Sequence, residues 1–385
     1  MSQSPPIYLD HQATTPVDPR VLEAMLPYYK GDFGNASSAT HAFGWRAEAA
    51  VEDARERIAQ CLAVDPNEIV FTSGATESNN LAIHGALNAT PGKAGSVVAT
   101  AIEHPSVLEA ATAQRAFGHR DVQVPVAASG LVDPSEIAAA IEDDTTLVSV
   151  SAANSEIGVL PDIAAIAVDC HERGVLFHTD AAQAIGKIPL SLADTEIDLL
   201  SFSAHKIYGP KGIGALYVRR RRPRIKLRPL VFGGGQEGGL RSGTLAVPLI
   251  VGFARALELC VEEQEGEAAR LRGLREKLRL EIERSVPEAV VNGDLEHRLP
   301  GNLSVSIPDV DGERLLLDLR GLAVSSGSAC SSGSGEPSHV LLALGRDKEL
   351  ARATVRFGLG RGTAEAEIAA AAGALAAAVR KQNSR

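Results

Sequence analysis

One lysine, Lys206, stands in an unusual place, between an apolar run and a tight turn. The apolar run at residues 197–202 is typical of a buried strand, and the Gly and Pro residues at 209–212 indicate the turn. The stem of a lysine packs well at such a point, but its ammonium needs water or a partner. Burial of the ammonium would lower the pKa of Lys206 and suit it to Schiff-base chemistry. A lysine that simply reaches solvent beside the turn explains the sequence equally well.

An aspartate, Asp180, follows another apolar run, at residues 175–178. Ligands of open parallel sheets bind at the carboxyl ends of the strands, so an acid there lies in the expected crevice. It could pair with a protonated ring nitrogen, or it could cap a helix. Asp180 precedes Lys206 by 26 residues (206 − 180), about one strand–helix–strand unit. We therefore expect the two strand ends to be neighbours at one sheet edge.

Two segments of small residues could bind an anion. Residues 73–80 follow a strand-like run, and a helix is expected to start near Thr76, where free backbone N–H groups and the helix dipole favour a phosphate. Residues 233–244 are rich in Gly and could approach an anion with backbone and hydroxyl groups. An ordinary Ser or Thr helix cap explains the first segment as well, and a flexible linker explains the second.

One of the four cysteines has different surroundings from the others. Cys330 lies in a stretch of Ser and Gly, residues 325–335, that is the best candidate for a flexible loop. An exposed thiol there could act as a nucleophile, and a free surface thiol is the alternative. Cys61, Cys170 and Cys260 lie in helical patterns and are expected to be small core residues. Four cysteines are too few for a disulfide framework, and no two of them are close enough in sequence to bind a metal ion together. This pattern favours the reducing cytosol as the compartment of the protein.

The elements that must position these residues alternate between strand-like and helix-like patterns through the first 220 residues. Strands with little polar alternation, separated by helices, indicate an α/β fold with a mainly parallel sheet covered on both faces. We expect strands at residues 69–71, 96–99, 147–150, 175–178, 197–202 and 215–218, and helices at 76–87, 107–117, 163–173 and 181–185.

A long charged amphipathic helix, at residues 247–284, is expected to lead into a smaller domain. Strand-like runs at residues 303–307, 322–324 and 354–357 and an Ala-rich helix after Thr363 belong to this part. The predicted division is a large domain of residues 15–255 and a smaller α+β domain of residues 1–14 and 256–385, with a loop at 325–336 that carries Cys330.

Composition and charge narrow the classes of function. The 385 residues include 45% hydrophobic residues and carry a formal net charge of −10, which argues against nucleic acid as a partner. The basic run at 219–224 is interpreted as a solvated loop, with a docking patch for an acidic protein as the minority alternative. The longest apolar run, 369–379, is too short to span a membrane, and the first residues lack the apolar core of a signal peptide. We therefore expect a cytoplasmic protein, and the histidine spacing predicts no metal site.

These residues, taken in order, resemble a known family. The pattern Asp-x-x-Gln from Asp180 to Gln183 and the pattern Ser-x-His-Lys-x-x-Gly-Pro-Lys-Gly from Ser203 to Gly212 resemble the pyridoxal-phosphate site of the class V aminotransferases. Within that family the chain is similar to cysteine desulfurases of the NifS/IscS type, and the resemblance covers nearly all of it. Further matching motifs begin at Tyr8, Thr72, Glu103, Asn154, Arg241, Ser325 and Arg356. The resemblance implies the PLP-dependent fold type I, with a mainly parallel seven-stranded sheet in the large domain.

The resemblance also implies a role for each matching residue near the cofactor ring. Lys206 would bind pyridoxal 5′-phosphate as a Schiff base and then shuttle the substrate α-proton. Asp180 would pair with the ring nitrogen, and His104 would stack on the ring as a possible acid or base. Gln183 and Asn154 would form hydrogen bonds with the cofactor on the side of the ring that carries its phenolic oxygen. For His104, which precedes a proline, a helix-entry residue is the alternative.

The remaining implied roles concern the phosphate and the substrate. Arg356, together with Asn154, would bind the substrate, with Arg356 on its carboxylate. An ordinary ion-pair partner within a strand is the alternative for Arg356. Thr244 would reach the phosphate of a neighbouring subunit, which implies a homodimer. The residues implied to hold the phosphate within one chain are Ala75, Thr76, Ser203 and His205.

The implied reaction removes sulfur from L-cysteine, giving L-alanine and a persulfide on Cys330. The sulfur would pass to an acceptor such as an iron–sulfur scaffold protein, so a transient iron–sulfur contact at Cys330 is the one metal contact that the resemblance allows. The alternatives are a selenocysteine lyase or another C–S lyase of the same family, and a non-catalytic sulfur-relay paralogue. An ordinary aminotransferase would have no use for Cys330.

Overall fold

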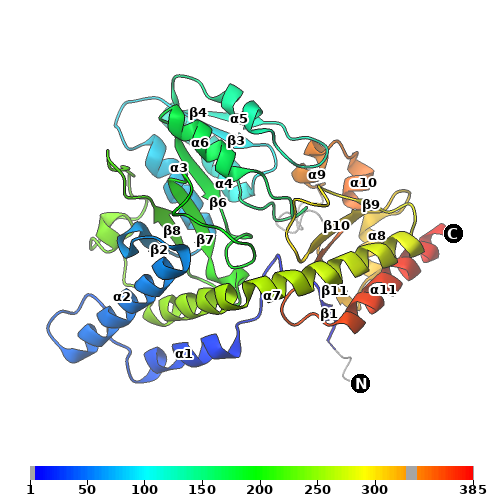
Figure 1. The fold of residues 1–385 in the computed structure, drawn as a ribbon, viewed down its shortest axis with the longest axis horizontal. Coiled ribbons are helices and arrows are strands. Elements are labelled where there is room, and N and C mark those ends of the chain that lie inside the picture. The colour runs from blue at the N-terminus through cyan, green and yellow to red at the C-terminus, as the bar shows by residue number, and fades with distance from the viewer. Residues whose placement is uncertain (1–4, 327–335, 385) are drawn as a thin grey trace.

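A seven-stranded sheet forms the centre of the larger lobe in the computed structural model, which describes residues 5–326 and 336–384 (Figure 1). Its strands are β2 (Ile69–Thr72), β3 (Ser96–Thr100), β4 (Arg120–Val124), β5 (Thr145–Ser149), β6 (Leu176–Asp180), β7 (Leu199–Ser203) and β8 (Gly214–Val218). They lie in the order β2-β8-β7-β6-β5-β3-β4. All neighbouring pairs from β7 to β4 are parallel, and β8 is antiparallel to both β2 and β7. The predicted mainly parallel seven-stranded sheet is therefore confirmed.

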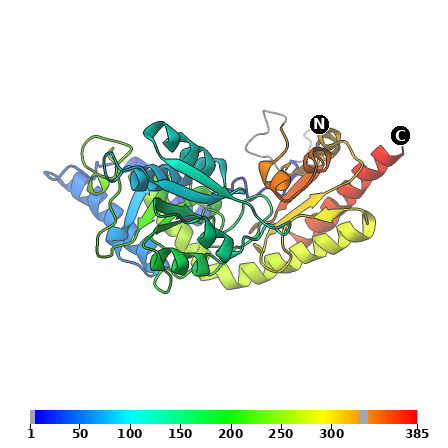
Figure 2. The same ribbon diagram turned by 90° about the horizontal axis from the view of Figure 1, so that it is seen from above.

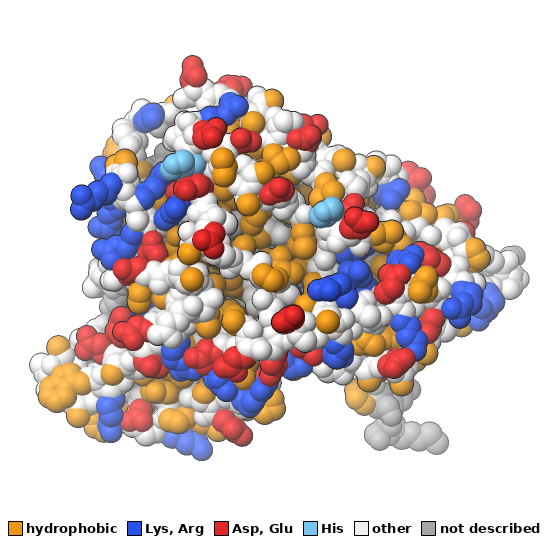
Figure 3. All heavy atoms as spheres, in the orientation of Figure 1, with side chains coloured by type: hydrophobic (Ala, Val, Ile, Leu, Met, Phe, Trp, Pro, Cys, Tyr) orange, Lys and Arg blue, Asp and Glu red, His pale blue; other side chains and the backbone are white. Residues whose placement is uncertain are grey.

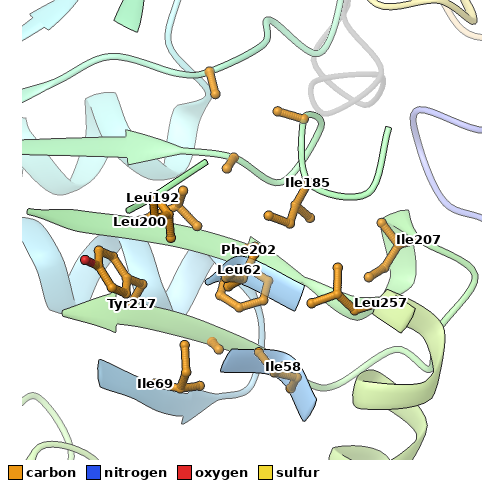
Figure 4. Close-up of a cluster of buried hydrophobic side chains, with 14 of the residues drawn as sticks. Ile58, Leu62, Ile69, Ile185, Leu192, Leu200, Phe202, Ile207, Tyr217 and Leu257 are labelled. Atoms are coloured by element: carbon orange, nitrogen blue, oxygen red, sulfur yellow. The ribbon is translucent and has the colours of Figure 1, made fainter. Parts of the chain in front are cut away.

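Helices cover this sheet because its inner strands are apolar on both faces; every residue of β7 is buried. The helices of this lobe are α1 (Pro19–Lys30), α2 (Ala42–Leu62), α3 (Ala75–Leu87), α4 (Pro105–Ala113), α5 (Pro134–Ala140) and α6 (Ile163–Glu172). Figure 4 shows Phe202 of β7 packed among side chains from α2 and from neighbouring strands. The ring of Phe202 lies 5.2 Å from that of Phe253, between their centroids. This rigid core fixes the strand ends at which the candidate site forms.

Two sequence-based expectations for this lobe are wrong. Residues 181–185, predicted as helical, form only turns, because five residues are too few to repay helix nucleation and Gly186 follows in a left-handed conformation (φ +70°). The seventh strand, β4, was missed because it lies at the sheet edge and carries charged and polar residues, unlike the apolar inner strands. The predicted neighbourhood of Asp180 and Lys206 is confirmed, since β6 and β7 are paired and parallel.

The smaller lobe has its own apolar core, formed by residues such as Leu9, Leu303, Phe357 and Leu375. It contains a parallel pair, β1 (Ile7–Tyr8) and β11 (Leu322–Ala323), and an antiparallel sheet of β9 (Val290–Val291), β10 (Asn302–Ser306) and β12 (Thr354–Gly358). Its helices are α8 (Gly312–Asp318), α9 (His339–Ala343), α10 (Lys348–Arg352) and α11 (Glu365–Asn383). The domain boundary near residue 255 stays a prediction.

The helix α7 (Val247–Ser285) runs from one lobe to the other (Figure 2). Its first half buries Ile250 and Phe253 in the core of the larger lobe, and its second half buries Leu278 and Ile282 in the core of the smaller one. The charged residues on its other face stay at the surface, which explains the amphipathic pattern. One continuous helix thus holds the two lobes together, and the candidate site lies between them.

Acidic and basic side chains are interspersed over the face shown in Figure 3. Three arginines of the basic run lie against acids: Arg219 on Glu196, Arg220 on Asp65 and Arg221 on Asp198. The run is therefore partly neutralised within the chain, which favours the solvated loop over a docking patch. No helix in the described ranges is long and apolar enough to cross a membrane.

Replacing Leu200 with alanine should lower the free energy of unfolding by about 2–5 kcal/mol, because Leu200 is fully buried in the core shown in Figure 4. The matched control is Leu317→Ala, since the Leu317 side chain is 57% exposed and should leave the stability nearly unchanged. Denaturant titration of both variants measures the difference. Equal stability of the two variants would contradict this packing.

Candidate active site

A cavity of about 560 Å³ opens at the carboxyl ends of β6 and β7, where the larger lobe meets β12 and residues 12–14. Ten of the predicted site residues line it: Ala75, Thr76, His104, Asn154, Asp180, Gln183, Ser203, His205, Lys206 and Arg356. Of the predicted site residues within the described ranges, only Thr244 does not. Residues far apart in the sequence therefore meet at one place, as expected for an active site at strand ends.

The buried carboxylate of Asp180, at the end of β6, lines the cavity. Its Oδ1 accepts a hydrogen bond from the backbone N–H of Ala182 (2.9 Å), and its Oδ2 accepts one from Nδ2 of Asn79 (2.7 Å). Asn79 lies on α3 and is fully buried. The two donors fix the orientation of the carboxylate, so Asp180 can face a cationic group in the cavity.

His104 lies beside Asp180 and caps α4, where Pro105 occupies the first turn. Its Nδ1 accepts a hydrogen bond from the backbone N–H of Ser106 (3.1 Å), and Ser106 Oγ lies 2.7 Å from the same nitrogen. Burial lowers the pKa of His104, so its ring is neutral near pH 7 and carries its proton on Nε2. His104 is therefore both a helix-entry residue and a residue of the cavity.

Asn79 connects these two groups. Its Nδ2 donates to Ser106 Oγ (2.8 Å) as well as to Asp180 Oδ2. A hydrogen-bonded chain therefore runs from Asp180 through Asn79 and Ser106 to His104. Neither Asn79 nor Ser106 was predicted as a site residue, although Asn79 stands in the matching motif that begins at Thr72.

Lys206 ends the short 3-10 helix Ala204–Lys206, directly after β7. Its Nζ donates to the backbone oxygens of Gln12 (2.5 Å) and Ala13 (2.8 Å). Lys206 therefore points into the cavity toward the N-terminal segment. This placement favours the lysine of a buried site over the alternative that reaches solvent beside the turn.

The start of α3 forms a cradle of backbone N–H groups at the edge of the cavity. The N-cap, Gly74, makes no side-chain hydrogen bond, so the predicted alternative of an ordinary Ser or Thr cap is wrong. The N–H groups of Ala75 and Thr76 in the first turn have no partner within the helix and face a cavity that Ser203 and His205 also line. Backbone donors and the helix dipole suit a phosphate at this point.

The cradle is compact because β8 presses against it. A Cβ at Gly214 would lie 2.7 Å from Cα of Gly74, so only glycine allows this approach. Burial, together with the charges of nearby lysines, lowers the pKa of His205 to about 4, so His205 is neutral near pH 7. Its Nδ1 lies 3.2 Å from Oγ1 of Thr14.

The Gly-rich segment at 233–244 is held in place, which contradicts a flexible linker. Arg241 Nε lies 2.9 Å from Oε1 of Glu77 in the first turn of α3. Burial disfavours the charged form of Glu77, but Arg241 and the hydrogen bonds of Ser73 outweigh it and lower its pKa. Thr244 at the end of the segment is exposed and lies outside this cavity.

Arg356 and Asn154 enter the cavity already held by other groups. The Arg356 Nη2 donates to Oδ1 of Asp10 (2.8 Å) and its Nη1 to the backbone oxygen of Ser155 (3.0 Å). Its Nε is buried and has no hydrogen-bond partner among the described residues. Asn154 Nδ2 donates to the backbone oxygen of Ile102 (2.8 Å), and its Oδ1 accepts two backbone N–H groups. Both side chains are therefore fixed before any ligand binds.

Two acids near the cavity, Glu103 and Glu156, were not predicted as site residues. Burial raises the pKa of Glu103 and of Glu156 to about 7. Glu103 accepts hydrogen bonds from Thr100 and Ser151, and Glu156 accepts one from Ser338 (2.5 Å). Glu156 and Ser338 thereby join the two lobes beside the cavity. Motif matches pointed to both glutamates, but only the fold shows their partners.

Cys330 lies outside the described residues. The other three cysteines are free thiols: Cys170 and Cys260 are buried and Cys61 is partly buried. Burial raises the pKa of Cys61 and Cys260 to about 11 and that of Cys170 to about 12, so all three are protonated near pH 7. The burial and the protonated state of these three thiols agree with their expected role as small core residues.

Comparisons with known proteins agree on one family. The sequence model described as Aminotransferase class-V matches residues 7–370. A curated relative, "Cysteine desulfurase IscS" of Methylobacillus flagellatus, is 51% identical over 369 residues, which are 96% of this chain and 91% of the relative. A solved structure named "NIFS-LIKE PROTEIN" has a TM-score of 0.90 and 39% identity and covers 98% of this chain and 100% of its own. Another, "SspA in complex with cysteine", has a TM-score of 0.81 and 38% identity and covers 92% of this chain and 98% of its own.

Proposed function

Because the chain belongs to the class V aminotransferase family and, within it, to the cysteine desulfurases, we propose that its cavity takes sulfur from L-cysteine with the help of pyridoxal 5′-phosphate. The observation that carries the proposal is the meeting of Lys206, Asp180 and Arg356 in one cavity between the lobes. An amine, a buried carboxylate and a guanidinium are the groups that an amino-acid substrate and a pyridine cofactor need. The solved relative that holds cysteine supports the choice of substrate.

The residues present fit this cofactor. The N-terminus of α3 offers backbone donors to a phosphate, and the oriented carboxylate of Asp180 can pair with a protonated ring nitrogen. When bound, the cofactor supplies an electron sink for the electron pair that remains when the Cα proton leaves. Lys206 would hold it covalently and His104 would lie against its ring, as the resemblance implies.

The chain's own residues bind the substrate and move its protons. Arg356 lines the cavity and receives the substrate carboxylate there, while Asp10 and Ser155 hold its guanidinium in place. Lys206 accepts the Cα proton and returns it. His104 is neutral and carries its own proton on Nε2. It can donate this Nε2 proton to a group in the cavity.

Cys330 carries out the sulfur transfer in this proposal. Its thiolate attacks the substrate sulfur, so a new S–S bond forms as the C–S bond breaks. The electron pair of the broken bond goes to the carbon skeleton, which takes up a proton and leaves as L-alanine. A persulfide remains on Cys330, and its outer sulfur passes to an acceptor thiol.

The wider assignments are part of the same proposal. The acceptor is a protein of iron–sulfur cluster assembly, supported by the name of the IscS relative. The enzyme works as a homodimer, supported by Thr244, which is exposed and free to approach a second subunit's cradle. A reducing, cytoplasmic setting is supported by the free thiols of Cys61, Cys170 and Cys260.

Incubation with L-cysteine tests the proposal. We expect L-alanine and, with a reducing thiol, sulfide to form in equal amounts. Selenocysteine in parallel distinguishes a selenocysteine lyase, which would release alanine from selenocysteine alone. Release of keto acid in place of alanine would indicate an aminotransferase, and no turnover at all would indicate the sulfur-relay paralogue; either result contradicts the proposal.

A further inference from the structure

A second lysine, Lys187, reaches Gln183 from outside the large cavity. Its Nζ donates to Oε1 of Gln183 (2.8 Å), and this is its one hydrogen bond within the part of the chain that the structure describes. Lys187 does not line the 560 Å³ cavity, whereas Gln183 does. It lines a separate small cavity of about 50 Å³ on the other side of Lys206.

The other end of the Gln183 amide is also engaged. Its Nε2 donates to the backbone oxygen of Gln12 (2.8 Å), and the same oxygen accepts the hydrogen bond of Lys206 Nζ. The reverse orientation of the amide would place Nε2 against the amine of Lys187 and Oε1 against a carbonyl oxygen. The donor-only ammonium of Lys187 and the carbonyl oxygen of Gln12 therefore both oppose the reverse orientation. The amide keeps its oxygen away from the cavity and has a second N–H on Nε2 left for a ligand there.

The charge around Lys187 is mixed. The small cavity is lined, besides the two lysines, by six other titratable side chains: His11, Tyr208, Cys260, Glu263, Glu267 and Arg361. Burial, reinforced by the charge of Lys206, lowers the pKa of Lys187 to about 7. An amine donates hydrogen bonds whether it is charged or neutral, so the contact with Gln183 survives on both sides of that pH.

We propose that Lys187 is a positioning residue that fixes Gln183 as a hydrogen-bond donor toward the phenolic oxygen of the cofactor. This inference rests on the proposed function, because the cofactor is part of that proposal. A donor at this oxygen stabilises its deprotonated form and thereby weakens proton binding by the bound cofactor. Without Lys187 only the carbonyl oxygen of Gln12 opposes the reverse orientation, so the amide turns more readily and presents its oxygen, which would strengthen proton binding.

The pH titration of the visible absorbance of the resting holoenzyme, without cysteine, tests this inference. Lys187→Met keeps the apolar stem and removes the donor. We expect the midpoint of its titration to rise by about one pH unit, a tenfold change in proton affinity. Lys187→Arg keeps a donor and should stay near the wild-type midpoint. If Lys187→Met does not fold, Lys187→Thr, which is too short to reach Gln183, serves in its place with the same expectation.

A double-mutant cycle separates positioning from a general effect of the lysine charge. In a Gln183→Ala background, Lys187→Met should cause no further shift of the midpoint. An unchanged midpoint in Lys187→Met, or an equal shift with and without Gln183, would overturn the inference. A wild-type protein without any visible cofactor absorbance would instead contradict the proposed function itself, so the two failures are distinguishable.

Discussion

Replacing Cys330 with serine is expected to abolish the release of alanine from L-cysteine, with a loss of at least about 10³-fold in turnover, while the bound cofactor keeps its absorbance. The physical reason is that a serine hydroxyl is far less acidic than a thiol and a poor nucleophile toward sulfur, so no S–S bond forms. The cavity residues that we propose to bind the cofactor and the substrate carboxylate are unchanged in this variant. The measurement is alanine formed per enzyme per minute, together with the absorbance spectrum.

The matched control for this variant is Cys61→Ser. Burial raises the pKa of Cys61 to about 11, so it is no thiolate near pH 7 and its loss should leave turnover close to that of the wild type. Normal alanine release by Cys330→Ser would show that another group takes the sulfur. Loss of activity in both variants would point to a structural effect of removing thiols.

Replacing Lys206 with alanine should remove both the covalent attachment of the cofactor and the group that moves the Cα proton. We expect turnover to fall by about 10³-fold or more. The absorbance of the protein-bound Schiff base should disappear as well. Among the described residues, Lys211 is the one further lysine that lines the cavity at the ends of β6 and β7. Lys206→Arg keeps the positive charge and should be equally inactive, because a guanidinium does not form this bond.

A surface variant, Lys93→Ala, is the control for the lysine variants, since Lys93 lies in an exposed loop. An unchanged spectrum in Lys206→Ala would contradict the assignment of Lys206 as the cofactor lysine. Attachment at Lys211 would then be the first alternative, and a digest of the borohydride-reduced enzyme would show which lysine carries the cofactor.

Much of the site was predictable because it depends on strand ends. An apolar run that ends in a functional residue, such as β6 at Asp180 or β7 before Lys206, places that residue at the sheet edge whatever the details of the connection. The connection itself was mispredicted as a helix at 181–185, and the edge strand β4 was missed. Neither error moved the site, because the pairing of β6 and β7 does not depend on them.

The supporting contacts were not predictable from the sequence. Asn79 reaches Asp180 across 101 positions of the chain, and Ser338 reaches Glu156 across 182. Lys187 lies only four residues after Gln183, yet the local pattern does not indicate that its amine binds the amide oxygen. Contacts of this kind follow from packing between elements, which a local pattern does not encode. Residue types that carry chemistry could be read from the sequence, and the groups that orient them could not.

The most direct test of the central claim is a mass measurement on the enzyme after a single turnover with L-cysteine in the absence of any acceptor thiol. The account predicts that the peptide containing Cys330 gains the mass of one sulfur atom, and that one molecule of alanine forms for each peptide so modified. Sulfur found on Cys61, Cys170 or Cys260, or alanine formed without any modified Cys330 peptide, would contradict the account.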